Sequence, residues 1–152
     1  MEPGTAYAVY HTGIAQLLKT DGQATPSQLH YLFMRKWAAR SVRADIEQCL
    51  AFMMRQDEVE QCGTAQNQLY GEEPLYRLKV LRKGYYLTKG GHQARLDEDI
   101  TIRGLGVVPG WGFVAYKSNG EFDFKDENYD PHPGDSVDLL IETWQPQPFN
   151  VQ

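Results

Sequence analysis

Four basic residues lie close together in the first third of the chain. They share a window of nine positions, within a stretch (residues 22–44) that contains no Asp or Glu: Arg35, Lys36, Arg40 and Arg43. Guanidinium and ammonium groups bind phosphate oxygens through charge-assisted hydrogen bonds, which fix a protein on a nucleic-acid backbone. The spacing therefore predicts a phosphate-binding patch.

A helix that begins near Ser41 supplies a second set of candidate contacts. Apolar residues recur every three or four positions up to Met54, which predicts a helix with one buried face. Stepping 100° per residue from that face identifies the outward residues as Ser41, Ala44, Gln48, Ala51 and Arg55. An amide such as that of Gln48 pairs with an adenine edge, and alanines contact thymine methyl groups. This face is compatible with a major groove.

Carboxylates accumulate in the last third of the chain. Seven Asp or Glu side chains stand between residues 121 and 138 against Lys125 alone, and we expect four of them to bind a partner: Asp123, Asp126, Glu127 and Asp130. Their near-alternate spacing invites comparison with a calcium loop, but the central Gly and closing Glu of an EF-hand are missing. An acidic surface instead suits a basic partner, or the basic patch of a neighbouring copy.

The sequence contains no pattern typical of catalysis, a cofactor or a metal ion. Residues 104–110 have a GxG start without the third glycine or the Lys-Ser/Thr of phosphate-binding loops, and we interpret them as a bend between strands. The four histidines lack metal-ligand spacing. Cys49 and Cys62 form no CxxC pair and are expected to be small apolar side chains. We therefore expect a protein that is not an enzyme and carries no cofactor or metal.

Three helices are predicted to position the basic residues. The first spans residues 5–19, where apolar side chains recur at helical spacing. The second begins at Thr25, which can cap a helix that has Pro26 in its first turn, while Gln28 reaches back to the backbone of the cap. It is short and gives way near residues 34–36. The third is the helix that begins around Ser41.

A hairpin follows the third helix. Residues 59–62 and 75–80 are predicted as strands, and residues 63–71 as a polar, turn-like loop between them. At its tip, Asn67 and Gln68 are candidates for contact with a minor groove. Glu72 and Glu73 are expected to repel phosphate.

The order of helix, helix, turn, helix, strand, loop and strand resembles the winged helix-turn-helix superfamily. The resemblance rests on residues 25–29, 41–54 and 59–80 and covers about half the chain. The connection from Met34 to Arg40 is longer and more basic than the usual turn. The resemblance implies a domain over residues 1–83 that binds double-stranded DNA through its third helix.

Residues 84–152 are predicted to form a β-rich module. Residues 100–102, 112–117, 121–124 and 137–141 have strand-like patterns, and Asn119-Gly120 is a hairpin signal because both turn positions require positive φ. The fold class expected is α+β, with the winged helix-turn-helix followed by a small antiparallel module for dimerisation or partner binding.

Length and charge narrow the function further. The 152 residues carry a formal net charge of −5, which argues against a protein that coats nucleic acid through charge alone. Neither an export signal nor a membrane-spanning run is recognised, so we expect a cytoplasmic, intracellular protein. The leading hypothesis is a homodimeric DNA-binding transcriptional regulator. The alternative is an interaction protein, an acidic inhibitor or adaptor that binds another, possibly nucleic-acid-binding, protein.

Overall fold

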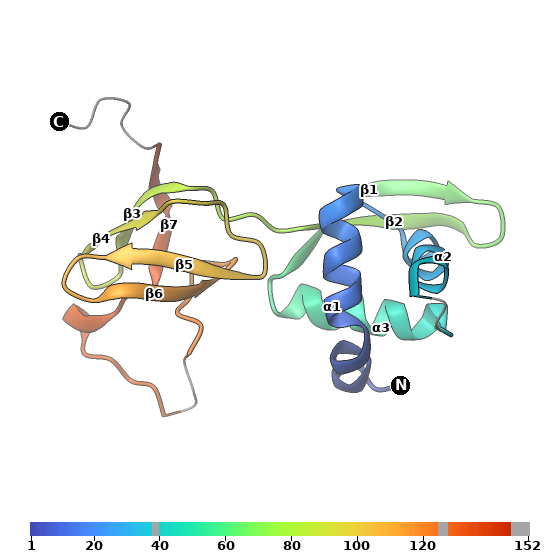
Figure 1. The fold of residues 1–152 in the computed structure, drawn as a ribbon, viewed down its shortest axis with the longest axis horizontal. Coiled ribbons are helices and arrows are strands. Elements are labelled where there is room, and N and C mark those ends of the chain that lie inside the picture. Colours follow the sequence, from blue (N-terminus) through green and yellow to red (C-terminus); the bar gives the residue numbers. More distant parts are fainter. Residues whose placement is uncertain (38–39, 125–127, 147–152) are drawn as a thin grey trace. The chain divides into compact units, whose positions relative to one another are not determined.

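Three helices precede all the strands in the computed structural model, which describes residues 1–37, 40–124 and 128–146. The described elements are α1 (Pro3–Asp21), α2 (Pro26–Trp37), α3 (Arg43–Arg55), β1 (Val59–Asn67), β2 (Gly71–Leu78), β3 (Gly84–Thr88), β4 (Gln93–Leu96), β5 (Arg103–Val108), β6 (Gly112–Lys117), a short 3₁₀ turn at Pro133–Asp135, and β7 (Leu139–Gln145) (Figure 1). These elements form two compact units, Met1–Lys79 and Val80–Gln152. The class is α+β, with two antiparallel sheets over the described residues.

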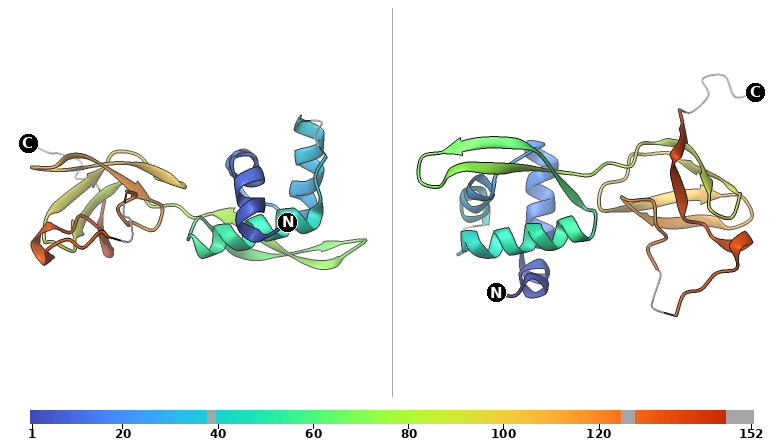
Figure 2. Two further views of the ribbon diagram at one scale, coloured as in Figure 1. Left: turned by 90° about the horizontal axis from the view of Figure 1, so that it is seen from below. Right: turned by 180° about the vertical axis from the view of Figure 1, so that it is seen from behind.

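The core of the N-terminal unit is made by the inner faces of its helices. Ile14 and Leu18 of α1, Leu29 of α2, and Ile46 and Leu50 of α3 are almost completely buried. Helices α1 and α3 cross and pack against each other, with α2 beside them (Figures 1 and 2). The helical periodicity of the apolar residues therefore corresponds to the observed core.

The start of α2 has the predicted reciprocal cap. The backbone N–H of Gln28 donates to Oγ1 of Thr25 over 3.2 Å, and the N–H of Thr25 donates to Oε1 of Gln28 over 2.9 Å. Two backbone donors that lack helical partners are thereby satisfied. The helix continues to Trp37, past the predicted end near residues 34–36.

The hairpin strands β1 and β2 are longer than predicted. Their register runs from Val59 opposite Leu78 to Asn67 opposite Gly71, so most of the polar loop expected at residues 63–71 is part of the ladder. Backbone hydrogen bonds stabilise the ladder whatever the side-chain polarity, which is why the pattern underestimated the strands. At the base of the hairpin, Tyr76 exchanges two backbone hydrogen bonds of 2.9 and 3.0 Å with Ala24.

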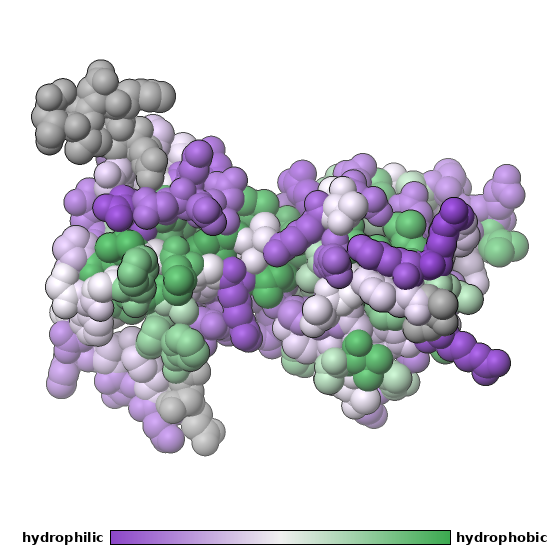
Figure 3. Space-filling model, in the orientation of Figure 1, coloured by the Kyte–Doolittle hydropathy of each residue, from purple (hydrophilic) through white to green (hydrophobic). Residues whose placement is uncertain are grey.

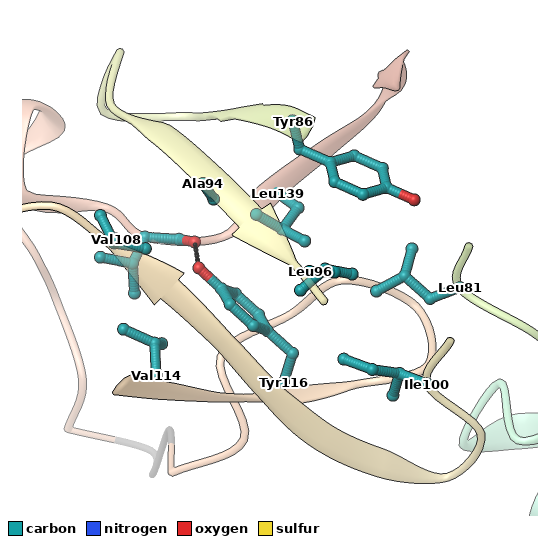
Figure 4. Close-up of a cluster of buried hydrophobic side chains, with 10 residues drawn as sticks. Leu81, Tyr86, Ala94, Leu96, Ile100, Val108, Val114, Tyr116 and Leu139 are labelled. Atoms are coloured by element: carbon teal, nitrogen blue, oxygen red, sulfur yellow. Dashed lines mark hydrogen bonds between the residues drawn. The ribbon is translucent and has the colours of Figure 1, made fainter. Parts of the chain in front are cut away.

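The C-terminal unit is a five-stranded antiparallel sheet in the order β6-β5-β4-β3-β7. Its strands enclose a core in which Leu96, Val108 and Tyr116 are fully buried (Figure 4). The Tyr116 hydroxyl donates to the carbonyl oxygen of Val137 over 2.6 Å, and that of Tyr86 donates to the carbonyl oxygen of Arg82 over 2.6 Å. Burial raises the pKa of Tyr86 to about 12 and raises that of Tyr116 further.

The prediction of a bend at residues 104–110 is wrong, because residues 103–108 form strand β5. A Cβ atom on Gly104 would lie 2.6 Å from Cγ1 of Ile100, and one on Gly106 would lie 2.6 Å from Cδ2 of Leu96. The two glycines therefore leave room for core side chains. The turn comes after β5, where the N–H of Trp111 donates to the carbonyl oxygen of Val108.

The expected strand at residues 100–102 is also wrong. Ile100 exchanges two backbone hydrogen bonds with Leu81, but the chain then bends, and Ile102 has a φ of 64°. A β-branched residue seldom adopts positive φ, so the alternating apolar pattern could not reveal this bend. The predicted strand at residues 137–141 begins two residues later, at Leu139.

Strand β6 has the predicted bounds and is followed by a turn at Ser118-Asn119-Gly120. Lys117 donates its N–H to the carbonyl oxygen of Glu121, which makes this a three-residue loop. Gly120 has a φ of 88°, whereas the φ of Asn119 is not positive. The prediction that both turn positions have positive φ is therefore wrong, and only the glycine is required to be in the left-handed region.

Candidate nucleic-acid interface

The outward face of α3 carries four of the five residues predicted for it. Ala44, Gln48, Ala51 and Arg55 are exposed. The opposite side of the helix, including Ile46, is buried against α1 and α2. The 13 residues of α3 form a rod of about 20 Å, from a rise of 1.5 Å per residue. This rod presents small side chains, one amide and one guanidinium to a ligand.

Ser41 is not on this helix, because α3 begins at Arg43. Its hydroxyl lies 2.7 Å from Nδ1 of His30, so Ser41 joins the connection between the helices to α2. On the helix flank, Asp45 is half-buried and lies 3.1 Å from the amino group of Met1.

Three of the four clustered basic residues are exposed. Arg35 lies on α2, where it donates to the Tyr31 hydroxyl over 2.8 Å. The Nζ atom of Lys36 lies 5.3 Å from the centre of the Trp37 ring. Arg40 stands in the connection before α3 and is also exposed. All three side chains are therefore exposed, and Arg40 precedes the start of α3 by three residues.

The fourth basic residue, Arg43, makes contacts within the chain. Its guanidinium forms ion pairs with Glu73 of β2 and Glu47 of α3. Its Nε donates to the Ser27 hydroxyl over 2.9 Å, and its Cζ lies 4.0 Å from the centre of the Tyr70 ring. Arg43 is predicted to contact a duplex backbone, but in the structure its side chain links α2, α3 and the hairpin.

Glu73 is buried and paired, which differs from the expected exposed carboxylate. Only 2% of its surface is accessible, and its Oε1 accepts hydrogen bonds from Arg43 and, over 2.7 Å, from Ser27. Burial opposes ionisation of Glu73, but the hydrogen bonds from Arg43 and Ser27 outweigh that effect and lower its pKa. The expected repulsion of phosphate therefore applies only to the exposed Glu72.

The hairpin tip is organised by Asn67. Its Oδ1 accepts the backbone N–H groups of Leu69 (2.8 Å) and Tyr70 (3.0 Å), so the side chain forms an Asx turn. Gln68 is exposed, as a groove contact requires. Leu69 is the most exposed large apolar residue described, at 85%, and sequence reasoning missed it because it looked only for polar tip residues.

A second polar cluster was missed because its members are far apart in the sequence. The Glu58 carboxylate is buried and accepts the Tyr7 hydroxyl over 3.0 Å, and His11 Nε2 lies 3.2 Å from the same oxygen. The other oxygen, Oε1, has no hydrogen-bond partner among the described residues. Nearby, burial and then the Glu58 charge raise the pKa of Cys49 to about 12, which leaves a protonated, weakly nucleophilic thiol.

The predicted acidic partner site is described only in part. Asp126 and Glu127 lie outside the described residues. Asp130 is exposed, whereas the Asp123 side chain is largely buried and lies 3.3 Å from Nε of Arg103. Asp123 is therefore neutralised within its own unit.

In residues 1–37, 40–124 and 128–146, no three His, Cys, Asp or Glu side chains meet in a way that could hold a metal ion. None of the described helices has the length and hydropathy needed to cross a bilayer.

Comparison of the chain with protein-family models, curated protein sequences and solved structures found no match.

Proposed function

We propose that the N-terminal unit is a winged helix-turn-helix domain that binds double-stranded DNA, with α3 as the recognition helix and the β1–β2 hairpin as the wing. The observation that carries this proposal is the exposed face of α3, formed by Ala44, Gln48, Ala51 and Arg55. The major groove of B-DNA admits one α-helix, and a helix entering it must bring small or hydrogen-bonding side chains. This face meets both requirements.

The arrangement around α3 supports this proposal. The hydrogen bonds between Ala24 and Tyr76 add a one-residue third strand to the hairpin, between α1 and α2. Arg35 and Lys36 are exposed in the last turn of α2, and Arg40 is exposed in the connection before α3. These three cations are available for phosphate contacts that would fix the register of α3 on a duplex. Arg43 acts as a support that ties the wing to the recognition helix.

The test is a fluorescence-anisotropy titration of the full chain on a mixed-sequence duplex of about 20 base pairs, at two salt concentrations. We expect binding that weakens as salt rises. Replacing Arg35, Lys36 and Arg40 together by Ala should reduce affinity more than tenfold and lower the salt slope by about one per lost contact. The matched control is Lys19→Ala, which removes an exposed charge from the last turn of α1.

Two outcomes contradict the proposal. One is an absence of binding even at low salt, and the other is an equal loss of affinity in the triple variant and in Lys19→Ala.

Selection of bound sequences from a random duplex pool then tests specificity. Gln48→Ala should relax the preference at one base position while leaving the salt slope unchanged. A mass measurement in solution tests the homodimer that a palindromic site requires.

A transcriptional role follows as part of this proposal, since a small sequence-specific DNA-binding protein acts by occupying its site. The exposed Leu69 favours a second candidate function, in which the unit contacts another protein through the wing tip. Fold alone does not decide between the two. Leu69→Ser should leave DNA affinity within about twofold if the tip serves a protein partner, and should reduce it if the tip enters a minor groove.

A further inference from the structure

The outer edge of β6 is only partly covered. Strand β6 ends the order of the five-stranded sheet. At one end of this edge, Asp123 donates its N–H to the carbonyl oxygen of Ala115 over 3.0 Å, and Lys117 donates to that of Glu121. Backbone groups alternate in direction along an antiparallel strand, so the N–H and C=O of Phe113 point to the same side as those of Ala115. Among the described residues, Phe113 forms no hydrogen bond on that side.

A groove of about 550 Å³ adjoins this edge. Half of the described lining residues are aromatic, and the residues used below are Trp111, Phe113, Phe122, Tyr129 and Asp135. The Phe122 ring centre lies 5.7 Å from that of Tyr129, with the two planes tilted by 54°. Hydrophobic side chains gather over the β5–β6 hairpin on the face in Figure 3. Phe113 of β6 is 77% exposed. Trp111 and Phe113 thus remain exposed beside the groove, whereas Phe122 packs against the core.

The charge beside the groove is negative. Asp135 lines the groove and is exposed, and no Lys or Arg belongs to the lining that the structure describes. Asp130 and Glu121 are exposed in the neighbouring segments. Aromatic faces attract cations through their quadrupole, and a carboxylate at the rim adds to that attraction. A ligand that fits this groove therefore carries positive charge together with apolar surface.

Two other occupants suit the groove less well. A nucleic acid would bring phosphates next to Asp135, which costs electrostatic energy. A second copy paired edge to edge through β6 would bring two acidic rims together, with the same cost. An extended peptide avoids both problems, because its backbone can pair with an open strand edge while its side chains enter the adjoining groove.

We propose that this groove binds an extended peptide segment of a partner protein. The peptide backbone pairs with Phe113 at the β6 edge, and a lysine or arginine side chain enters between the rings next to Asp135. The site belongs to the C-terminal unit and is independent of the DNA-binding proposal. The ligand proposed for the acidic half of the chain is therefore an extended peptide with basic and apolar side chains.

The experiment selects binders to the full chain from a displayed library of random nine-residue peptides. We expect enrichment of Lys or Arg beside apolar residues. Asp135→Asn and Trp111→Ala should each reduce the affinity for the selected synthetic peptides about fivefold to tenfold. Isothermal titration calorimetry measures this affinity. The control is Leu87→Ala, which removes a comparably exposed apolar side chain from β3. Methylating the peptide amides that face the strand edge should abolish binding, because it removes the ladder donors.

Three results overturn the proposal. The first is a library that yields no enriched peptide, or only acidic ones. The second is equal affinity for the original chain, Asp135→Asn and Trp111→Ala. The third is a doubled mass in solution that Phe113→Ser abolishes, which would make a second copy the occupant. Circular dichroism of each variant establishes that a lost affinity is not a lost fold.

Discussion

Glu73 in the N-terminal unit and two tyrosines in the C-terminal unit are buried in different protonation states. In the N-terminal unit, the Glu73 carboxylate is buried as an ion and is held by Arg43 and Ser27. In the C-terminal unit, the Tyr86 and Tyr116 hydroxyls are buried in the neutral state and donate to backbone carbonyl oxygens. A buried ion depends on its counterion, whereas a buried hydroxyl depends on keeping its proton. Glu73 and the two tyrosines are therefore expected to respond differently to mutation and pH.

The largest expected effect is the loss of stability when the buried ion pair between Arg43 and Glu73 is broken. Arg43→Ala leaves Glu73 buried without its counterion and should lower the free energy of unfolding by about 3 kcal/mol. Arg40→Ala, three residues earlier and exposed, should leave that free energy unchanged within about 0.5 kcal/mol. Urea denaturation followed by far-ultraviolet circular dichroism measures both. Similar values for the two variants would show that the pair with Glu73 contributes nothing.

Alkaline pH tests the buried hydroxyls. Burial raises the pKa of both tyrosines above the ordinary value of 10.0, that of Tyr86 to about 12. Their contribution to stability is complete below pH 10 and is lost as pH rises toward the folded-state values, because the unfolded chain gives up these protons first. Ultraviolet titration should show that Tyr86 and Tyr116 ionise late, together with unfolding. Uniform ionisation near pH 10 would contradict this.

Acid pH tests the buried carboxylate. The pKa of Glu73 is lowered from 4.5, so its contribution is present above pH 4.5 and is lost as pH falls through the lower folded-state value. The urea midpoint of the original chain should therefore fall more steeply from pH 5 to pH 3 than that of Glu73→Gln. Parallel profiles for the two proteins would show that Glu73 does not contribute to acid sensitivity.

The smallest expected effect is on duplex affinity, and it follows from removing the exposed charge of Arg40. Arg40→Ala should weaken duplex binding about threefold to fivefold and lower the salt slope by about one, if Arg40 contacts a phosphate. Anisotropy at two salt concentrations measures both quantities. A change in sequence preference instead of in salt slope would mean that Arg40 contacts bases.

Local patterns predicted much of the fold, because the forces that they encode are local. The cap between Thr25 and Gln28 spans three residues, and the outward face of α3 follows from helical periodicity alone. Both were correct. The strand-like pattern at residues 100–102 failed because the positive φ of Ile102 has no signature in side-chain polarity.

The candidate sites were harder to predict because their partners are distant in sequence. Arg43 was predicted to bind phosphate because the sequence around it does not indicate an ion pair with Glu73, which lies 30 positions away. A signal for Glu73 did exist. Residues two apart on a strand share a face, so Glu73 lies on the side of Leu75 and not on that of Glu72. The groove beside β6 combines segments that only the folded sheet brings together.

The hydrogen bonds between Ala24 and Tyr76 also have a consequence for the order of folding. They join the connection after α1 to a strand that the chain reaches 52 residues later. Contacts of such long sequence separation slow folding, because the entropy of loop closure must be overcome before they form. The three helices are local and can form early. We therefore expect the N-terminal unit to become fully protected from hydrogen exchange only when β2 has joined it.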